Sequence, residues 1–247
     1  AWVPYSAGDL IPLDNAGKAL VRVLLAPEQD TGSDNSEPFS LTATNTGGTA
    51  ATPAAVTIKD DGSGTVFTAA DPSSNLTLTT VTAPTPVSGV VVSANAADLP
   101  NDDRPLTINN LTINEGSPFA VFTVTGATGQ YVKLALADGT AKVDANGTPL
   151  TDGTEDYGPA LEYFNGTNWV AYTANSFVQI PAGGTTLLVR TSIVNDAVAD
   201  NAQTFTLTAT NTGTSSVVGT ATIYDDGTGN IFSGSSATPT ANVPATS

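Results

Sequence analysis

Apolar and polar residues alternate along much of this chain in short runs, which is the pattern of β-strands with one buried face. In FSLTAT (residues 39–44), Phe39, Leu41 and Ala43 share one face and hydroxyl residues occupy the other. YVKLAL (residues 131–136) alternates in the same way. Clusters of Gly, Pro, Asn and Asp separate these runs, as turns do in all-β proteins.

The second half of the chain carries enough of these runs for one complete sandwich. Residues 104–232 are predicted to form a β-sandwich of about seven strands. The expected strands lie near residues 107–113, 118–125, 131–136, 160–164, 169–180, 186–194, 204–210 and 219–224.

The first part of the chain repeats the last part of this sandwich. FSLTATNTGG (residues 39–48) returns as FTLTATNTGT (205–214), and IKDDG (58–62) returns as IYDDG (223–227). Residues 1–67 therefore repeat residues 168–232, and we expect them to be the later strands of an incomplete sandwich. Their missing early strands are expected from another polypeptide segment, either the preceding part of a long chain or a neighbouring copy in a filament.

Two segments lie outside the repeated units. Residues 68–103 are rich in Ala, Pro, Ser and Thr, and we interpret them either as a connector or as an extra hairpin packed on a sandwich. Residues 233–247 have a similar composition and are expected to link to a further repeat.

The charge balance limits the possible partners. The formal net charge is -16, and the seven Lys and Arg residues are scattered singly. Phosphate backbones and anionic lipid surfaces would repel such a chain, so nucleic acid is not an expected partner. No long apolar run is present, so we expect no membrane insertion in this segment.

The chain lacks the residues of most catalytic sites. It contains no His and no Cys, which excludes Ser-His-Asp, Cys-His and His-based zinc chemistry within it. DTGS (residues 30–33) spells an aspartic-protease signature, but apolar strand residues do not precede Asp30, and we expect no catalysis there. Trp2 and Trp169 occupy matching positions in the repeat, which favours packing over sugar stacking. The protein is expected not to be an enzyme.

Six short motifs follow one another in a fixed order through residues 104–232. They are residues 114–117 (NEGS), 138–141 (DGTA), 155–157 (EDY), 180–183 (IPAG), 194–196 (VND) and 223–227 (IYDDG). In this order they resemble the Calx-β repeat, an immunoglobulin-like sandwich. The resemblance implies an all-β fold of tandem immunoglobulin-like (Calx-β-like) β-sandwiches, with the first one incomplete in this chain.

The resemblance also implies Ca²⁺ at one end of each sandwich. The ligands that it assigns are Glu115, Asp156, Asp196, Asp200, Asp225 and Asp226 in residues 104–232, and Asp30, Asp34, Glu37, Asp60 and Asp61 in the first copy. Carboxylates held together repel one another unless a cation bridges them. The alternative is that Asp-Asp-Gly is only a β-turn and the other acids are solvated. Gln203 stands where the first copy has Glu37, which puts one ligand position in doubt.

These features favour a non-catalytic structural repeat, rigidified by calcium, of a long extracellular adhesin or surface fibre on a bacterial cell. Its expected partners are neighbouring repeats of the same protein or neighbouring copies in a filament. Alternatives are a self-assembling filament or surface-layer subunit, a module that binds a glycan or protein, and an accessory region of a secreted hydrolase.

Overall fold

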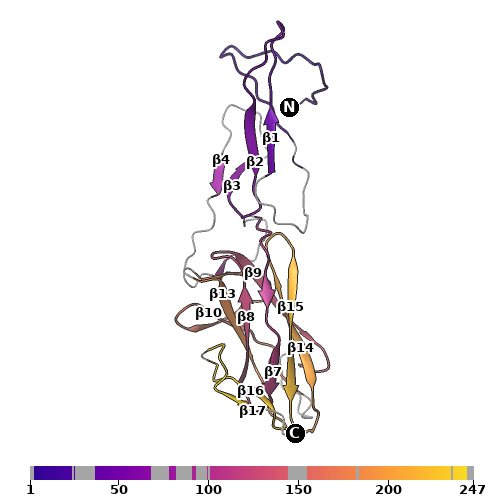
Figure 1. Cartoon of the computed structure of the whole chain (residues 1–247), viewed down its shortest axis with the longest axis vertical. Coiled ribbons are helices and arrows are strands. Elements are labelled where there is room, and N and C mark those ends of the chain that lie inside the picture. The colour runs from indigo at the N-terminus through magenta and orange to yellow at the C-terminus, as the bar shows by residue number, and fades with distance from the viewer. Residues whose placement is uncertain are drawn as a thin grey trace.

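The computed structural model describes residues 3–23, 25, 37–67, 78–81, 91–92, 99, 101–143, 155–181, 184–234 and 236–243. Within these ranges the protein is all-β, as predicted, and contains no helix. Accordingly, the described residues include no helix that could cross a membrane. A sandwich forms one end of the molecule, and two small hairpins form the other (Figure 1).

Two sheets make up the sandwich. The first, in pairing order, contains β11 (Trp169–Ala171), β10 (Glu162–Phe164), β13 (Thr186–Ser192), β8 (Phe119–Thr125) and β6 (Thr107–Ile108). The second contains β17 (Ala241–Val243), β16 (Gly229–Ile231), β7 (Leu111–Asn114), β15 (Ser216–Tyr224), β14 (Gln203–Thr210), β9 (Tyr131–Asp138), β12 (Phe177–Gln179) and β5 (Val91–Val92).

The core fills the space between these sheets. Every buried apolar residue of the described chain lies between Leu106 and Phe232. At its centre Phe205 stacks on Tyr157, with ring centroids 4.2 Å apart, and meets the edge of Phe122 at 6.0 Å. Such aromatic pairs stabilise a core beyond the area they bury. The predicted alternation is confirmed in β14, where Phe205, Leu207 and Ala209 are buried.

The prediction of one strand over residues 169–180 is wrong, because this segment crosses between the two sheets. β11 belongs to the first sheet and β12 to the second. A turn at Thr173–Ser176 separates them, with Asn175 at a positive φ of 64°. The Tyr172 hydroxyl fastens this turn, since it donates to Ser176 O at 2.6 Å and accepts from Leu134 N at 3.0 Å.

The run at residues 107–113 is likewise divided. β6 pairs antiparallel with β8 in the first sheet, whereas β7 pairs parallel with β15 in the second. Asn109 and Asn110 lie between them, and their side-chain oxygens accept from Thr123 N and Thr220 N. These bonds satisfy one backbone donor in each sheet where the chain passes from one to the other.

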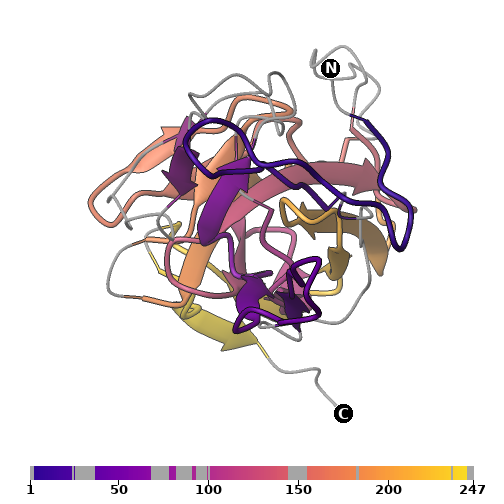
Figure 2. The ribbon, with the colours of Figure 1, turned by 90° about the horizontal axis from the view of Figure 1, so that it is seen from above.

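The repeated N-terminal segment forms a hairpin of β1 (Glu37–Leu41) and β2 (Ala54–Ile58). β3 (Gly64–Phe67) and β4 (Leu78–Val81) form a second hairpin. β4 and β5 lie in residues 68–103, and β17 lies in residues 233–247. Viewed from above, the N-terminal strands lie over the sandwich (Figure 2).

A buried polar joint connects the hairpins to the sandwich. Asp61 pairs with Asp102 in an isolated β-bridge, and Asp103 N donates to Asp60 O at 3.0 Å. Asp102 is fully buried, and its carboxylate accepts hydrogen bonds from Arg104 Nε at 2.9 Å and from Arg104 Nη2 at 2.6 Å. This two-pronged ion pair compensates the buried charge of Asp102.

Two further residues hold the segment that carries Arg104. Gln130 Nε2 donates to Arg104 O at 2.6 Å, and Asn211 Nδ2 donates to it at 3.2 Å. The backbone of Gly213 lies against the carboxylate of Asp103, where a Cβ would come within 1.4 Å of Oδ1. A larger residue at position 213 would therefore displace the Asp103 carboxylate.

Candidate functional site

The candidate site lies at the end of the sandwich where β7 and β15 finish. These strands run parallel, with Asn114 opposite Tyr224, so the residues that follow them emerge side by side. Glu115 and Asp225 are those residues. Glu115 N donates to Tyr224 O at 2.9 Å and continues the ladder by one bond. The parallel pairing therefore positions the two carboxylates.

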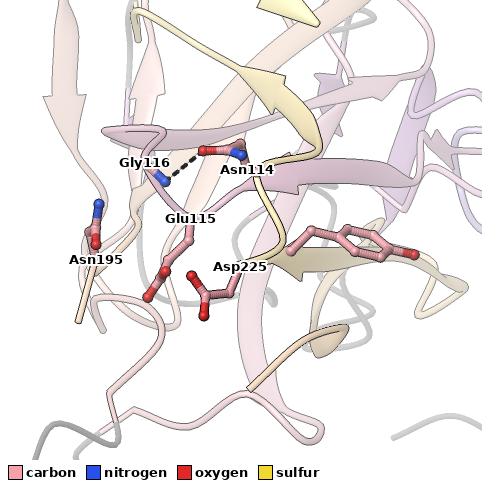
Figure 3. A pocket seen from close by; sticks show the side chains of 7 residues that line it. Asn114, Glu115, Gly116, Asn195 and Asp225 are labelled. Carbon is pink, nitrogen blue, oxygen red and sulfur yellow. Dashed lines mark hydrogen bonds between the residues drawn. The ribbon is translucent and has the colours of Figure 1, made fainter. Parts of the chain in front are cut away.

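A cleft of about 200 Å³ opens between these strand ends. Its lining residues are Asn114, Glu115, Gly116, Asn195, Tyr224, Asp225 and Gly227. In Figure 3 the carboxyl groups of Glu115 and Asp225 point toward each other, and Asn195 lies on the other side of Glu115. The cleft thus offers carboxylate and amide oxygens.

Glu115 is almost completely buried, with 8% of its surface exposed. Burial, together with the carboxylates of Asp225 and Asp196, raises its pKa to about 7, although the backbone N–H of Asp196 acts in the opposite direction. That N–H donates to Glu115 Oε1 at 2.9 Å. The nearby Asp225 carboxylate favours the protonated form of Glu115, so Glu115 holds a proton up to about neutral pH.

A second acidic group lies beside the first. Asp156 is 6% exposed, and burial raises its pKa, with additional repulsion from Asp200, Asp196 and Asp138. Lys142 N donates to Asp156 Oδ2 at 2.7 Å. Asp196 is close enough to raise the pKa of both Glu115 and Asp156, so it links the two groups.

In three of these acids, one carboxylate oxygen accepts a hydrogen bond from a backbone N–H. Glu115 accepts from Asp196 N, Asp156 from Lys142 N, and Asp196 from Val198 N. Each bond fastens a loop at the sandwich end. Carboxylate oxygens of this type are the ligands that Ca²⁺ prefers.

The other two predicted ligands of this sandwich, Asp226 and Asp200, accept hydrogen bonds from neighbouring side chains. Asp226 is exposed, and the Thr228 hydroxyl and backbone N–H lower its pKa. Asn201 also donates to it, at 3.1 Å. Asp200 accepts from the Gln203 side chain at 2.9 Å, so the amide at position 203 stabilises Asp200 where a glutamate would repel it.

Of the predicted ligands of the first copy, the three that the structure describes form no metal-binding group. Asp30 and Asp34 lie outside the described residues. Glu37 begins β1 opposite Ile58, whereas Asp60 and Asp61 belong to the joint. The Ser63 hydroxyl lowers the pKa of Asp61. Their place at the joint depends on residues 102–104, where the Asp-Asp-Arg run is a weak signal that could have indicated it.

Across the part of the chain that the structure describes, no three His, Cys, Asp or Glu side chains converge at metal-binding distance. The donor chemistry of the acidic end fits Ca²⁺, and Glu115 and Asp225 face each other there without a third acidic side chain at metal-binding distance. Like charges in a partly buried site repel one another, so an open arrangement is expected before a cation enters.

Trp169 packs within the protein. The guanidinium of Arg190 lies 4.3 Å from the centre of the Trp169 ring and 4.0 Å from that of Phe119. Phe164 also contacts Trp169, at 5.4 Å between ring centroids. These contacts account for the packing role expected of Trp169. Trp2 lies outside the described residues.

The comparisons with known proteins give weak structural similarity alone. No family model matches the chain, and no curated protein matches it. A crystal structure of the apo form of the Calx CBD1 domain is 14% identical, with 49% of this chain and 97% of that chain covered and a TM-score of 0.32. A crystal structure of the calcium-binding domain CBD12 of CALX1.1 is 16% identical, with 49% and 44% covered and a TM-score of 0.35. The CupB2 chaperone of Pseudomonas aeruginosa is 9% identical, with 47% and 53% covered and a TM-score of 0.27. The chain is thus an all-β protein weakly similar to Calx-β domains.

Proposed function

We propose that this chain is a non-catalytic structural module whose complete sandwich binds Ca²⁺ at the acidic end formed by Glu115, Asp156, Asp196 and Asp225. The observation that carries the proposal is the juxtaposition of Glu115 and Asp225 in a cleft lined by oxygen donors. A bound cation would replace the proton of Glu115 and offset the negative charge of the two carboxylates.

Calcium at this position ties together loops that are distant in sequence. Glu115 follows β7, Asp225 follows β15, and Asp196 lies in the segment between β13 and β14. A cation that contacts all three fixes the end of both sheets. Calcium that binds only the folded state stabilises the sandwich. At a calcium concentration of ten times the dissociation constant, the free energy of unfolding rises by about 1.4 kcal/mol.

The setting that we propose is a long extracellular adhesin or surface fibre of a bacterium, in which such modules act as spacers. The internal repeat, the net charge of -16 and the absence of His and Cys support this setting. Extracellular calcium modules bind with dissociation constants of about 0.1–1 mM, which suits a weak, open site of this kind.

Melting the full chain in 5 mM CaCl₂ and again in chelator tests the proposal. We expect calcium to raise the melting temperature by about 4–6 °C. Asp225→Asn removes most of this shift, whereas Asp9→Asn, a change in an exposed turn of the first copy, preserves it. Coincident melting curves in calcium and chelator would overturn the proposal.

Proton release gives a second, independent measurement. Because the pKa of Glu115 is about 7, calcium binding at pH 7 should release about half a proton from the Glu115–Asp225 pair. Calorimetric titration in two buffers of different ionisation enthalpy measures this number. A heat of binding that is the same in both buffers contradicts binding at this pair.

A further inference from the structure

The β1–β2 hairpin reproduces the β14–β15 hairpin strand for strand. In β1–β2, Phe39 lies opposite Val56 and Leu41 opposite Ala54. The corresponding pairs in β14–β15 are Phe205 with Ala221 and Leu207 with Gly219. The repeated sequence therefore folds with the same register in both places, and each position of one hairpin has a counterpart in the other.

In the complete sandwich, strands from earlier in the chain cover both edges of this hairpin. β9 pairs antiparallel with β14, and β7 pairs parallel with β15. The first sheet covers the inner face, where Phe122 meets Phe205. As a result Phe205, Leu207 and Ala221 are all completely buried.

The same positions are open in the first copy. Leu41 is 45% exposed and Val56 is 42% exposed. β1 and β2 form a two-stranded sheet, and no other described strand pairs with either outer edge. All but two of the exposed large apolar residues of the described chain lie between Val3 and Val56, the other two being Val198 and Val218. Open strand edges beside an apolar face are a template for strand addition.

We propose that β1–β2 is a strand-acceptor surface, and that its occupant is a polypeptide with the strand pattern of residues 107–138. This occupant adds a parallel strand to β2 and an antiparallel strand to β1. By the register of β15 with β7, the parallel strand places its equivalent of Leu111 opposite Val56 and its equivalent of Ile113 opposite Ile58. The proposal concerns a different surface from the acidic end and does not depend on calcium.

Counting the strands excludes an intact second copy as the donor. The described residues of each chain contain two such hairpins, β1–β2 and β14–β15, but one set of early strands, β6–β10. If the early strands of one copy covered β1–β2 of another, they would expose their own β14–β15. Such an exchange covers no additional apolar surface, so the donor must be a further segment of the same kind.

A peptide of residues 105–116 (PLTINNLTINEG), which carries the sequences of β6 and β7, is the probe. We expect it, labelled with a fluorophore, to bind the full chain saturably, as measured by fluorescence anisotropy. The same peptide with Ile113→Asp should not bind, because a carboxylate would then face the apolar surface.

Variants of the full chain locate the binding surface. Val56→Asp should weaken binding at least about tenfold, because it places a charge on the acceptor face. Val218→Asp is the matched control: Val218 is 55% exposed on β15 outside the core, and its replacement should leave peptide binding within about twofold. Circular dichroism confirms that both variants remain folded.

A disulfide between the peptide and the chain tests the proposed strand register. The cysteines replace threonines and a serine, so the apolar residues of the acceptor face are unchanged. The chain has no cysteine, so a Thr57→Cys variant carries a single thiol. Thr57 is the counterpart of Thr222, which lies opposite Thr112 in the sandwich. A Thr112→Cys peptide should therefore form a disulfide with Thr57→Cys, and not with Ser40→Cys on the neighbouring strand β1.

Three results would overturn the proposal. The first is no saturable binding of the peptide. The second is equal cross-linking at positions 57 and 40, which would indicate attachment without a register. The third is self-association of the full chain, measured by sedimentation without peptide, that Val56→Asp abolishes, because a second copy would then cover the face.

Discussion

The carboxyl groups of Glu115 and Asp225 face each other at the end of the sandwich, although they follow two different strands of the second sheet. Burial of Glu115 and the nearby charge of Asp225 raise the pKa of Glu115 to about 7. Without a cation, the pair is most stable when it retains one proton. The protein therefore carries a group that titrates near neutral pH, although it contains no histidine.

The stability of the calcium-free protein should fall as the pH rises from about 4.5 to 7. The folded state holds the proton on Glu115 up to a pKa of about 7, whereas the unfolded chain releases it near the ordinary glutamate pKa of 4.5. The stabilisation from the Glu115 proton is therefore fully present below about pH 4.5 and is lost as the pH rises through 7. Asp156, whose pKa is also raised, contributes in the same direction.

Glu115→Gln should flatten this pH dependence. The amide keeps the acceptor for Asp196 N and a donor toward Asp225, so at pH 8 in chelator it should stabilise the protein by about 1–2 kcal/mol. Urea unfolding at several pH values measures the effect. Asp226→Asn is the control, because the pKa of Asp226 is lowered and the group stays ionised throughout this range. An unchanged slope in Glu115→Gln would show that another group titrates.

Leucine-to-alanine changes at the equivalent positions Leu207 and Leu41 should lower the free energy of unfolding by very different amounts. Leu207 is completely buried, so Leu207→Ala should destabilise the sandwich by about 2–5 kcal/mol. Leu41 occupies the same place in β1 but is 45% exposed, and Leu41→Ala should cost less than about 1 kcal/mol. Urea unfolding of both variants provides the comparison. Equal costs would mean that the β1–β2 face is covered in solution.

Removing Arg104 should destabilise the joint. Asp102 is fully buried and would lose the guanidinium that compensates its carboxylate, so Arg104→Ala should cost about 2–4 kcal/mol. Arg104→Lys should recover only part of this, because an ammonium group cannot reproduce the two-pronged contact. Lys18→Ala, in an exposed turn, is the control for loss of a cation. A change below about 0.5 kcal/mol in Arg104→Ala would contradict the assigned role.

Replacing Arg190 should disturb Trp169. The guanidinium lies between the Phe119 and Trp169 rings and receives support from Glu162, whose Oε2 is 2.6 Å from Arg190 Nε. Arg190→Lys should cost about 1–2 kcal/mol because an ammonium group does not stack as a plane. In a Trp2→Phe background, where Trp169 is the only tryptophan, its emission should shift to the red. An unchanged spectrum would show that Arg190 does not shield the ring.

The sequence by itself determined the strands and the repeat. Period-two alternation follows from the geometry of a single strand, so it can be recognised without knowing what the strand packs against. For the same reason the hairpin register is equal in β1–β2 and β14–β15, because it depends on the local sequence and turn. The candidate acids could also be listed, although the ligand set came from a resemblance.

Only the tertiary structure decided which of these positions are buried and which acids meet. Phe39 and Phe205 have nearly the same local sequence, yet only Phe205 is completely buried, because β7, β9 and the first sheet cover it. Glu115 meets Asp225 because a parallel pairing joins strands far apart in the chain. The break between β11 and β12 likewise depends on which sheet each half can join. Burial and charge proximity arise from contacts between distant segments, and the pattern within a segment does not contain them.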